Sequence, residues 1–240
     1  MIRPTRALVF GASGAIGSRV ASRFASNGWE VIGVSRTVKD ITGGAEAIRH
    51  VAYDPFDAAS RPLELQAGEP AFGAVCWAQG RNASDNVANV DLVEHLAVYQ
   101  ANCLYILATL RILLSNNLLL PRARLCVISS IWQNLARQDK LSYCMSKAAL
   151  QGLVLSASAD LARDGILINA ILPGALDTPM TRQNVAPAQL QKLESATYFN
   201  GLPAVSDVAA LATFLCSEDN TSITGQFVSV DLGFSHVRLL

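Results

Sequence analysis

The chain has 240 residues, of which 51% are hydrophobic and 16% charged, and its 19 Lys and Arg balance its 19 Asp and Glu. This composition supports one large hydrophobic core and excludes a disordered chain or a small disulfide-stabilised protein. The zero net charge and the absence of a basic run argue against a nucleic-acid partner. The five cysteines are scattered through apolar runs, so we expect buried thiols in a cytoplasmic protein without a targeting segment.

Short apolar runs recur along the chain and predict seven strands. These runs are Ala7 to Phe10, Glu30 to Val34, Arg49 to Tyr53, Ala74 to Trp77, Leu125 to Ile128, Leu167 to Leu172 and Phe227 to Val230. Most are continuously apolar and are separated by helix-length segments, which predicts a parallel sheet with helices on both faces. The expected fold class is therefore α/β, doubly wound, and we assign residues 1–240 to one domain because no linker or repeat marks a second.

Two predicted helices have unusual surfaces. The first, about 91–115, is apolar nearly all round, and the second, about 141–163, has small residues at four-residue spacing. We expect these helices to pack against a second copy of the chain in a homodimer or homotetramer, the alternative being two core helices of a monomer. The uncharged run 96–110 contains Gln100 and Asn102 and is too short and polar for a membrane span, so no membrane partner is expected.

Three glycines follow the first predicted strand and precede a helix-forming stretch from Ser18 to Phe24. They are Gly11, Gly14 and Gly17. Glycine allows a tight turn and lets backbone N–H groups approach a pyrophosphate at the positive end of the next helix. The pattern indicates a dinucleotide site, although the same turn could be purely structural.

The second strand ends in Ser35 and Arg36, where an NAD site would have Asp or Glu to bind the ribose 2′-hydroxyl. A guanidinium beside a hydroxyl suits the 2′-phosphate of NADP instead. We therefore expect NADP(H) as the preferred cofactor, with NAD(H) as the second choice. The alternative interpretation of Arg36 is an exposed loop arginine.

The segment with the most specific chemistry contains Ser130, Tyr143 and Lys147. Tyr143 and Lys147 are four residues apart, so they share one face of a helix. An ammonium near a phenol stabilises the phenolate and lowers an ordinary pKa of about 10 toward neutrality, so Tyr143 could exchange a proton at physiological pH. A neighbouring serine hydroxyl could orient a carbonyl.

With these motifs in order, the chain resembles the short-chain dehydrogenase/reductase family, in its single-domain branch. The resemblance implies that Ser130, Tyr143 and Lys147 are catalytic and that Asn102 holds a proton-relay water. It implies a Rossmann fold with cofactor-binding residues beyond those named above. These are Ser13, Ile16, Asp54, Ala78, Gly80, Pro173, Gly174, Leu176 and Thr178.

The chain departs from the family pattern mainly around the expected dinucleotide. Phe10 replaces a threonine, Ala15 stands where the second glycine is usual, and Tyr105 replaces a common glycine. The segment from Trp77 to Gly80 replaces the family's NNAG motif and lacks its asparagines. Pro55 follows the expected adenine-binding Asp54 and has no N–H to offer.

The resemblance implies hydride transfer between a nicotinamide and a small carbonyl or alcohol substrate, with Tyr143 protonating the oxygen and Ser130 binding it. A flap at about 179–202 would close over the substrate, and Trp132 and Met180 are candidates for the pocket wall. The three histidines have no metal-ligand spacing, so no metal is expected.

Two other functions stay open at this point. The first is reduction of a 3-oxoacyl thioester on an acidic carrier protein, docked by Arg122, Arg124 and Arg163. The second, of another class, is a non-catalytic dinucleotide sensor or scaffold, which the altered glycine loop would suit. The complete catalytic set favours an enzyme over that sensor.

Overall fold

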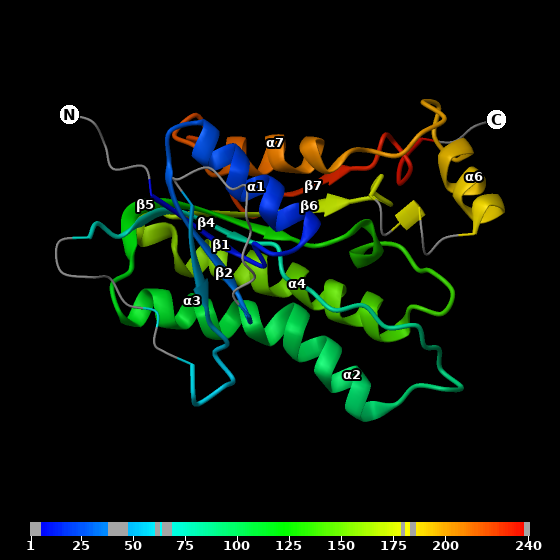
Figure 1. Cartoon of the computed structure of the whole chain (residues 1–240), viewed down its shortest axis with the longest axis horizontal. Helices are drawn as coiled ribbons and strands as arrows, with labels where there is room; N and C mark the ends of the chain where they lie inside the picture. The colour runs from blue at the N-terminus through cyan, green and yellow to red at the C-terminus, as the bar shows by residue number, and fades with distance from the viewer. Residues whose placement is uncertain are drawn as a thin grey trace.

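The structure is a computed structural model that describes residues 6–37, 48–60, 63, 69–178, 181–182 and 186–237. A parallel sheet with strand order β3-β2-β1-β4-β5-β6-β7 forms its centre (Figure 1). The strands are β1 (Arg6–Phe10), β2 (Glu30–Ser35), β3 (Ile48–Ala52), β4 (Phe72–Trp77), β5 (Leu119–Ile128), β6 (Leu167–Pro173) and β7 (Phe227–Val230). The predicted seven-stranded doubly wound α/β fold is confirmed, although β5 begins at Leu119 rather than Leu125.

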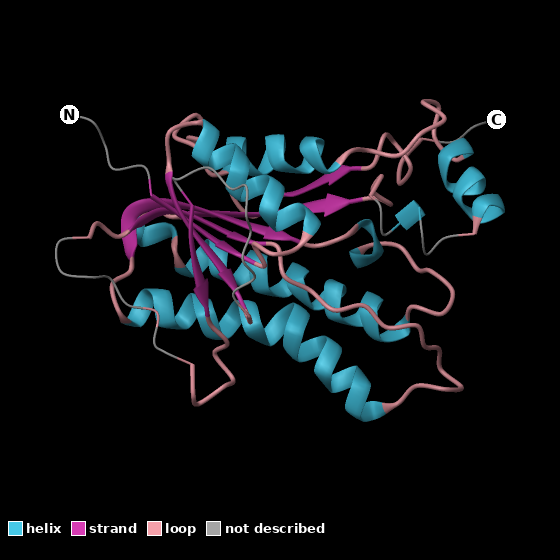
Figure 2. Ribbon diagram, in the orientation of Figure 1, coloured by secondary structure: helices cyan, strands magenta, loops and turns pink. Residues whose placement is uncertain are grey.

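Helices cover both faces of the sheet, as Figure 2 shows. One face carries α1 (Ala15–Ser26) and α7 (Val205–Leu215), and the other carries α2 (Leu92–Tyr99), α3 (Tyr105–Ser115) and α4 (Leu141–Asp160). Helix α6 (Pro187–Ser195) lies beyond the carboxyl end of the sheet. The helix predicted to reach Arg163 ends at Asp160, and a 3-10 turn over Ala162–Asp164 follows it.

Strand β1 shows how the continuously apolar sequence serves two layers. Side chains alternate across a strand, so Ala7 and Val9 enter the core beneath α1 and α7, while Leu8 and Phe10 enter the core beneath α3 and α4. All four are fully buried. The two cores explain why the sequence lacks the apolar–polar alternation of a half-exposed sheet.

The helix expected over 91–115 is interrupted by a π-helical segment, Gln100–Leu104, between α2 and α3. Sequence periodicity did not predict this interruption, which lies around Asn102. Among the described residues, Leu92–Ser115 is the one helix whose length and hydropathy would allow it to cross a membrane, and 44% of its apolar window is buried in the fold. Core helices of other proteins pass the same test.

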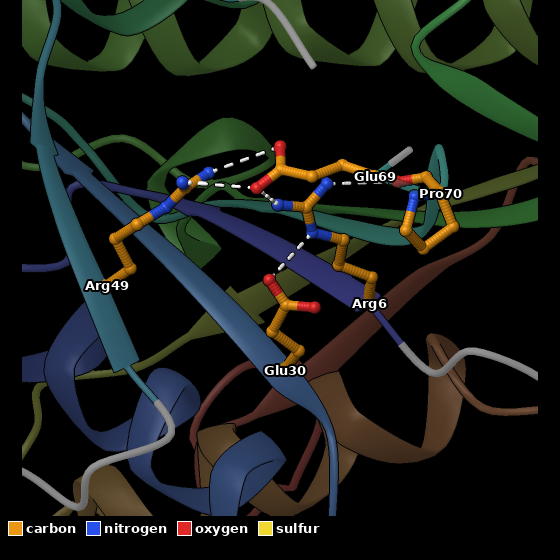
Figure 3. A network of polar contacts seen from close by, with 5 residues as sticks. All are labelled: Arg6, Glu30, Arg49, Glu69 and Pro70. Atoms are coloured by element: carbon orange, nitrogen blue, oxygen red, sulfur yellow. Dashed lines mark hydrogen bonds and ion pairs between the residues drawn. The ribbon is translucent and has the colours of Figure 1, made fainter. Parts of the chain in front are cut away.

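A buried arginine joins three strands at the amino end of the sheet (Figure 3). The Arg6 side chain is 1% exposed, and its guanidinium contacts Glu30 at 3.1 Å and Glu69 at 2.8 Å. Arg49 on β3 also contacts Glu69, at 3.1 Å, and Arg6 donates a hydrogen bond to the carbonyl oxygen of Pro70. Pairing allows this charge to be buried at the end of the sheet opposite the expected site.

The predicted buried thiols are present. All five cysteines are free, and Cys144 alone among them is partly exposed. Cys76 and Cys126 are paired across β4 and β5, and their hydrogen bond, together with burial, raises the pKa of Cys76 well above its ordinary value. A thiol held in its neutral form in this way is a poor nucleophile.

Candidate active site

The glycine turn after β1 is set by close backbone contacts. Gly11 has a φ of +76°, and a Cβ there would lie 2.5 Å from the backbone nitrogen of Gln79. A Cβ on Gly17 would lie 2.2 Å from the carbonyl oxygen of Gly11. Gly14 is less crowded and forms the N-cap of α1, so the start of that helix is open to a ligand. Gly11 and Gly17 are thus required by close backbone contacts, whereas a Cβ on Gly14 would meet only the carbonyl oxygen of Gly11, at 3.3 Å.

A cavity of about 340 Å³ opens beside this turn, at the carboxyl ends of β1, β2 and β4. It lies next to the point between β1 and β4 where the strand order reverses, the usual ligand position in doubly wound folds. Eight predicted cofactor residues line it, namely Gly11, Ser13, Gly14, Ser35, Arg36, Asp54, Ala78 and Gly80. We call it the dinucleotide cavity.

Polar groups at the end of β2 are arranged around this cavity. The hydroxyl of Ser35 is buried and accepts a hydrogen bond from the backbone N–H of Ser13 at 3.1 Å, which ties the glycine turn to β2. Arg36 is exposed at the cavity edge. The Asp54 carboxylate accepts a hydrogen bond from the backbone N–H of Phe56 at 3.0 Å, so the side chain of Asp54 holds the loop after Pro55.

Three aromatic rings lie beneath the dinucleotide cavity at positions that depart from the family pattern. Phe10 and Trp77 stack with ring centroids 5.8 Å apart, and Tyr105 meets Phe10 edge-on, also at 5.8 Å. The Trp77 indole donates a hydrogen bond to Thr109 at 2.8 Å, and the Tyr105 hydroxyl donates one to the Tyr53 carbonyl at 3.2 Å. The three departures are therefore a single packed cluster, which we call the aromatic floor.

Gln79 is a site residue that the sequence analysis missed. It lines the dinucleotide cavity, yet both polar atoms of its side-chain amide are buried and have no hydrogen-bond partner among the described residues. A buried, unpaired amide costs free energy unless a ligand supplies its partners. Its position after β4, in place of the family's NNAG motif, was the available signal.

A second cavity, of about 370 Å³, continues from the first and shares Gly14 and Ala78 with it. The predicted residues that line it are Ile16, Ser130, Trp132, Tyr143, Pro173, Gly174, Leu176 and Thr178. Asn82, Arg137, Lys140 and Thr181 also line it and were not predicted. Because Ser130 and Tyr143 share this wall, we call it the catalytic cavity.

Ser130 and Tyr143 are held by rigid neighbours. Ser130 follows β5 and accepts a hydrogen bond from the backbone N–H of Trp132 at 3.3 Å, which starts a short 3-10 turn. Tyr143 lies in the first turn of α4, where the Asp85 carboxylate accepts hydrogen bonds from the backbone N–H and the hydroxyl of Ser142. The entry of α4 into the site is therefore fixed by a loop that follows β4.

Lys147 lies one turn after Tyr143, with its Nζ 5.7 Å from the centre of the phenol ring. Burial lowers the pKa of Lys147 to about 8, and the ammonium donates a hydrogen bond to the Ile128 carbonyl at 3.0 Å. Burial raises the pKa of Tyr143, and a hydrogen bond with Ser130 partly offsets that rise. The expected lowering of the Tyr143 pKa by Lys147 is thus absent from this structure, since the phenol and the ammonium are both desolvated.

Asn102 joins three elements behind the catalytic cavity. Its Oδ1 accepts a hydrogen bond from the Arg81 backbone N–H at 2.7 Å. Its Nδ2 donates to the Arg81 carbonyl at 2.9 Å and to the Ser146 hydroxyl at 2.8 Å. The π-helical segment, a feature common at functional sites, carries the asparagine toward both the loop after β4 and helix α4.

The expected flap is only partly covered by the described residues. Helix α6 lies within it, and Leu193, Thr197 and Leu202 line a small cavity together with Trp132. Trp132 therefore lines both this small cavity and the catalytic cavity, and its role as a wall of the substrate pocket stays a prediction. Met180, the other predicted pocket residue, lies outside the described residues.

The residues present fit a nicotinamide dinucleotide. The two cavities form one groove along the carboxyl edge of the sheet, a helix N-terminus opens onto it, and Gln79 offers an unpaired amide. No group of three or more His, Cys, Asp or Glu that could hold a metal ion occurs among the residues described.

Solved structures share this fold over nearly the whole chain. A short-chain dehydrogenase/reductase family oxidoreductase from Burkholderia thailandensis is 25% identical, with a TM-score of 0.84 over 98% of this chain and 94% of the other. ElxO with NADP bound has a TM-score of 0.82 at 21% identity, over 96% of this chain and 98% of the other. The second likeness, at this identity, concerns the fold alone.

Curated relatives are oxidoreductases. The uncharacterized oxidoreductase YmfI of Bacillus subtilis is 27% identical over 95% of this chain and 98% of its own. Glucose 1-dehydrogenase of Gluconobacter oxydans is 28% identical over 96% and 91%. The (3R)-3-hydroxyacyl-CoA dehydrogenase of Canis lupus familiaris is 39% identical, but over 47% of this chain and only 43% of its own length.

Two family models match the chain. One, described as NAD dependent epimerase/dehydratase family, matches residues 7–123. The other, described as enoyl-(acyl carrier protein) reductase, matches residues 66–235, which is more than half of the chain and includes all four predicted catalytic residues. With the oxidoreductase relatives and the shared fold, these matches show that the chain is an NAD(P)-dependent oxidoreductase of the short-chain dehydrogenase/reductase family.

Proposed function

We propose that the protein reduces a ketone or aldehyde to an alcohol with NADPH, using Ser130, Tyr143, Lys147 and Asn102. The observation that carries this proposal is the shared wall of the catalytic cavity. Ser130 and Tyr143 line it beside Gly14, Pro173 and Gly174. A substrate carbonyl in this cavity would meet two hydroxyl groups next to the expected nicotinamide site.

The glycine turn and the N-terminus of α1 would hold the pyrophosphate, and Pro173, Gly174, Leu176 and Thr178 would contact the nicotinamide half. When bound, the cofactor supplies the hydride. Leu176 is buried and Thr178 is held by a hydrogen bond to Thr181, so this wall is formed before any ligand arrives.

Tyr143 would donate its phenolic proton to the developing alkoxide, while the Ser130 hydroxyl donates a hydrogen bond to the same oxygen. Tyr143 is neutral at physiological pH, because its pKa is raised, and it therefore carries the proton that reduction consumes. Lys147 would bind the ribose hydroxyls with the hydrogens that Ile128 does not accept. Asn102 holds the loop after β4 against α4, and in the proposed relay a water beside it returns the proton.

Arg36 supports a preference for NADP(H). Its guanidinium is exposed at the edge of the dinucleotide cavity, next to Ser35 and without a carboxylate in the position that NAD-binding folds use. An exposed guanidinium can bind a 2′-phosphate in two-pronged geometry. NAD(H) would lack that contact.

Reduction of a 3-oxoacyl thioester is the second candidate, favoured by the partial match to a (3R)-3-hydroxyacyl-CoA dehydrogenase. The carrier-docking surface expected at Arg122, Arg124 and Arg163 does not suit it. Arg124 is buried and donates a hydrogen bond to the Asn220 carbonyl at 2.8 Å. These arginines also lie toward the amino end of β5, whereas Ser130 follows its carboxyl end.

Replacement of Tyr143 by Phe tests whether the protein is a reductase or a non-catalytic dinucleotide sensor. Over a panel of ketones, aldehydes and an acetoacetyl thioester, the variant is expected to lose about 100-fold or more in NADPH oxidation rate, since general acid catalysis contributes about 10² to 10⁴. Thermal unfolding with NADPH serves as the control for cofactor binding. Equal rates in both proteins would eliminate the mechanism, and NADPH binding without turnover of any substrate would favour the sensor.

We also propose a homo-oligomer through the groove between α3 and α4. This groove, of about 660 Å³, is mostly apolar, and Leu104, Leu107 and Leu114 are exposed beside it. Arg111 and Asp160 lie on its rim, so a second copy related by a twofold axis could bring opposite charges together. Sedimentation of Leu107→Glu should show monomers where the native chain shows dimers or tetramers.

A further inference from the structure

The catalytic cavity contains two cations that the reductase mechanism does not use. Arg137 and Lys140 line it together with Ser130 and Tyr143, in the segment that connects β5 to α4. Within the described part of the chain, no Asp or Glu lines this cavity. The cavity wall is therefore positively charged beside the catalytic hydroxyl groups.

Lys140 is held in place by uncharged oxygens. Its Nζ donates hydrogen bonds to the Asn82 side chain at 3.1 Å, the Ala83 carbonyl at 2.9 Å and the Ser84 hydroxyl at 2.9 Å. Burial and the charge of Arg137 lower the pKa of Lys140, with Asp85 and Asp139 opposing. The ammonium is thus positioned, and its charge is not neutralised by an ion pair among the described residues.

Arg137 makes a cation–π contact. Its guanidinium lies 5.7 Å from the centre of the Trp132 ring, and that ring packs edge-on against Phe234 at 6.1 Å. In the part of the chain that the structure describes, no carboxylate or hydrogen-bond acceptor engages the guanidinium. A cation–π contact holds the guanidinium beside the ring without using its N–H groups as hydrogen-bond donors, so those groups can bind a ligand.

We propose that Arg137 and Lys140 form an anion-binding subsite of the catalytic cavity, and that the substrate is a ketone or aldehyde carrying a carboxylate or phosphate group. Two neighbouring cations repel each other, and an anion between them relieves that repulsion. An arginine fork also matches the geometry of both anions. The substrate class rests on the proposed reductase function, whereas the anion site stands on its own geometry.

The diphosphate of the cofactor is the competing anion. It would lie at Gly14 and the start of α1, on the wall where the two cavities meet. If Arg137 served the cofactor, Arg137→Gln would weaken NADPH binding. We expect the NADPH affinity of this variant to be unchanged, measured by quenching of tryptophan fluorescence in the absence of any substrate.

Binding of simple probes tests the subsite without turnover. With NADP⁺ present, benzoate should raise the unfolding midpoint of the native protein and benzamide should not, because the two differ in charge and little in shape. Arg137→Gln should abolish the difference, and Arg163→Gln, at an exposed site distant from the cavity, should keep it. Equal effects of benzoate and benzamide on the native protein would overturn the anion site.

Turnover of matched substrates tests the substrate class. Methyl ketones with a terminal carboxylate are compared with their methyl esters, and a phosphorylated hydroxyketone with its free alcohol. We expect kcat/KM to favour the anionic member of at least one pair by tenfold or more, and Arg137→Gln to remove that preference. The pair in which the anionic member is preferred shows whether the substrate carries a carboxylate or a phosphate.

The outcomes separate the two proposals. Preference for the neutral member in every pair would overturn the substrate class and leave the reductase in place, while no reduction of any substrate would overturn the reductase. Because Lys140 also holds the loop at 82–84, Lys140→Met risks a folding defect. Lys140→Arg keeps the positive charge and should retain the preference for the anionic substrate. A purely structural role of Lys140 would not require that the charge be kept.

Discussion

The two halves of the groove, the dinucleotide cavity and the catalytic cavity, are stabilised differently. Beneath the dinucleotide half, the rings of Trp77 and Tyr105 both pack against Phe10, at the positions where the chain departs from the family pattern. Behind the catalytic half, Asn102 and Lys147 are held by hydrogen bonds to Arg81, Ser146 and Ile128. The first half is therefore stabilised mainly by packing of aromatic rings, and the second by hydrogen bonds.

This difference follows from what each half must do. A surface beneath a bound nucleotide needs the right shape, which several combinations of buried side chains can provide if their total volume is conserved. A proton donor and its hydrogen-bonded neighbours need fixed distances, and a displacement of about 1 Å can cost about 10²-fold in rate. The departures from the family pattern therefore lie where the packing of side chains matters more than the geometry of proton transfer.

Truncation of the aromatic floor should have the largest effect. Phe10→Ala removes a fully buried ring that contacts both Trp77 and Tyr105, so the free energy of unfolding should fall by about 3 to 5 kcal/mol. Phe10 also precedes Gly11, so NADPH binding should weaken as well. Phe24→Ala, in the other core, is the control, since it should cost similar stability in urea unfolding and spare NADPH affinity. Equal NADPH affinity in both variants would show that the aromatic floor does not contribute to cofactor binding.

The catalytic half should show a pH-dependent cost of burial. Burial lowers the pKa of Lys147 to about 8 from 10.5, so between these values the unfolded chain binds more protons than the folded one. Stability carried by this group therefore rises with pH through that window, and below pH 8 the full cost, about 3 kcal/mol, is present. Lys147→Met should be more stable than the native protein near pH 7, with the gap closing toward pH 10.5. Lys192→Met, at an exposed position of α6, should show no such trend.

Cofactor choice should depend on one exposed charge of the dinucleotide half. Arg36→Asp is expected to weaken NADPH binding by about 1.5 to 3 kcal/mol, the range for a hydrogen bond to a charged group, and to leave NADH affinity equal or higher. Arg163→Asp makes the same charge change away from the groove and should alter neither affinity. Unchanged NADPH affinity in Arg36→Asp would remove this residue from the site. Calorimetric titration of both cofactors gives the comparison.

The sequence analysis predicted the layers, which the structure confirms, and it named candidate catalytic residues, because both leave local signals. Continuous apolar runs identify buried parallel strands, and the spacing of Tyr143 and Lys147 places them on one helix face. The π-helical segment at Asn102 left no such signal, because this helix is apolar nearly all round and the shift of its face by one extra residue in a turn does not show in the sequence. The packing of Phe10 on Trp77 joins positions far apart in the chain, so the separate departures could not be recognised as one cluster.

Gln79 belongs to the dinucleotide half, yet within the part of the chain that the structure describes its buried amide lacks the hydrogen-bond partners that the polar groups of the catalytic half have. Gln79→Leu should therefore raise the free energy of unfolding by about 1 kcal/mol without cofactor, since it removes an unsatisfied polar group, and should weaken NADPH binding severalfold. Gln133 is the matched control, because its side chain is buried but accepts a hydrogen bond from Ser129 at 2.7 Å. Gln133→Leu should be destabilising in the same denaturant titration. A loss of stability in Gln79→Leu with unchanged NADPH affinity would mean that the amide has partners within the protein, and that the dinucleotide half is as fully hydrogen-bonded as the catalytic one.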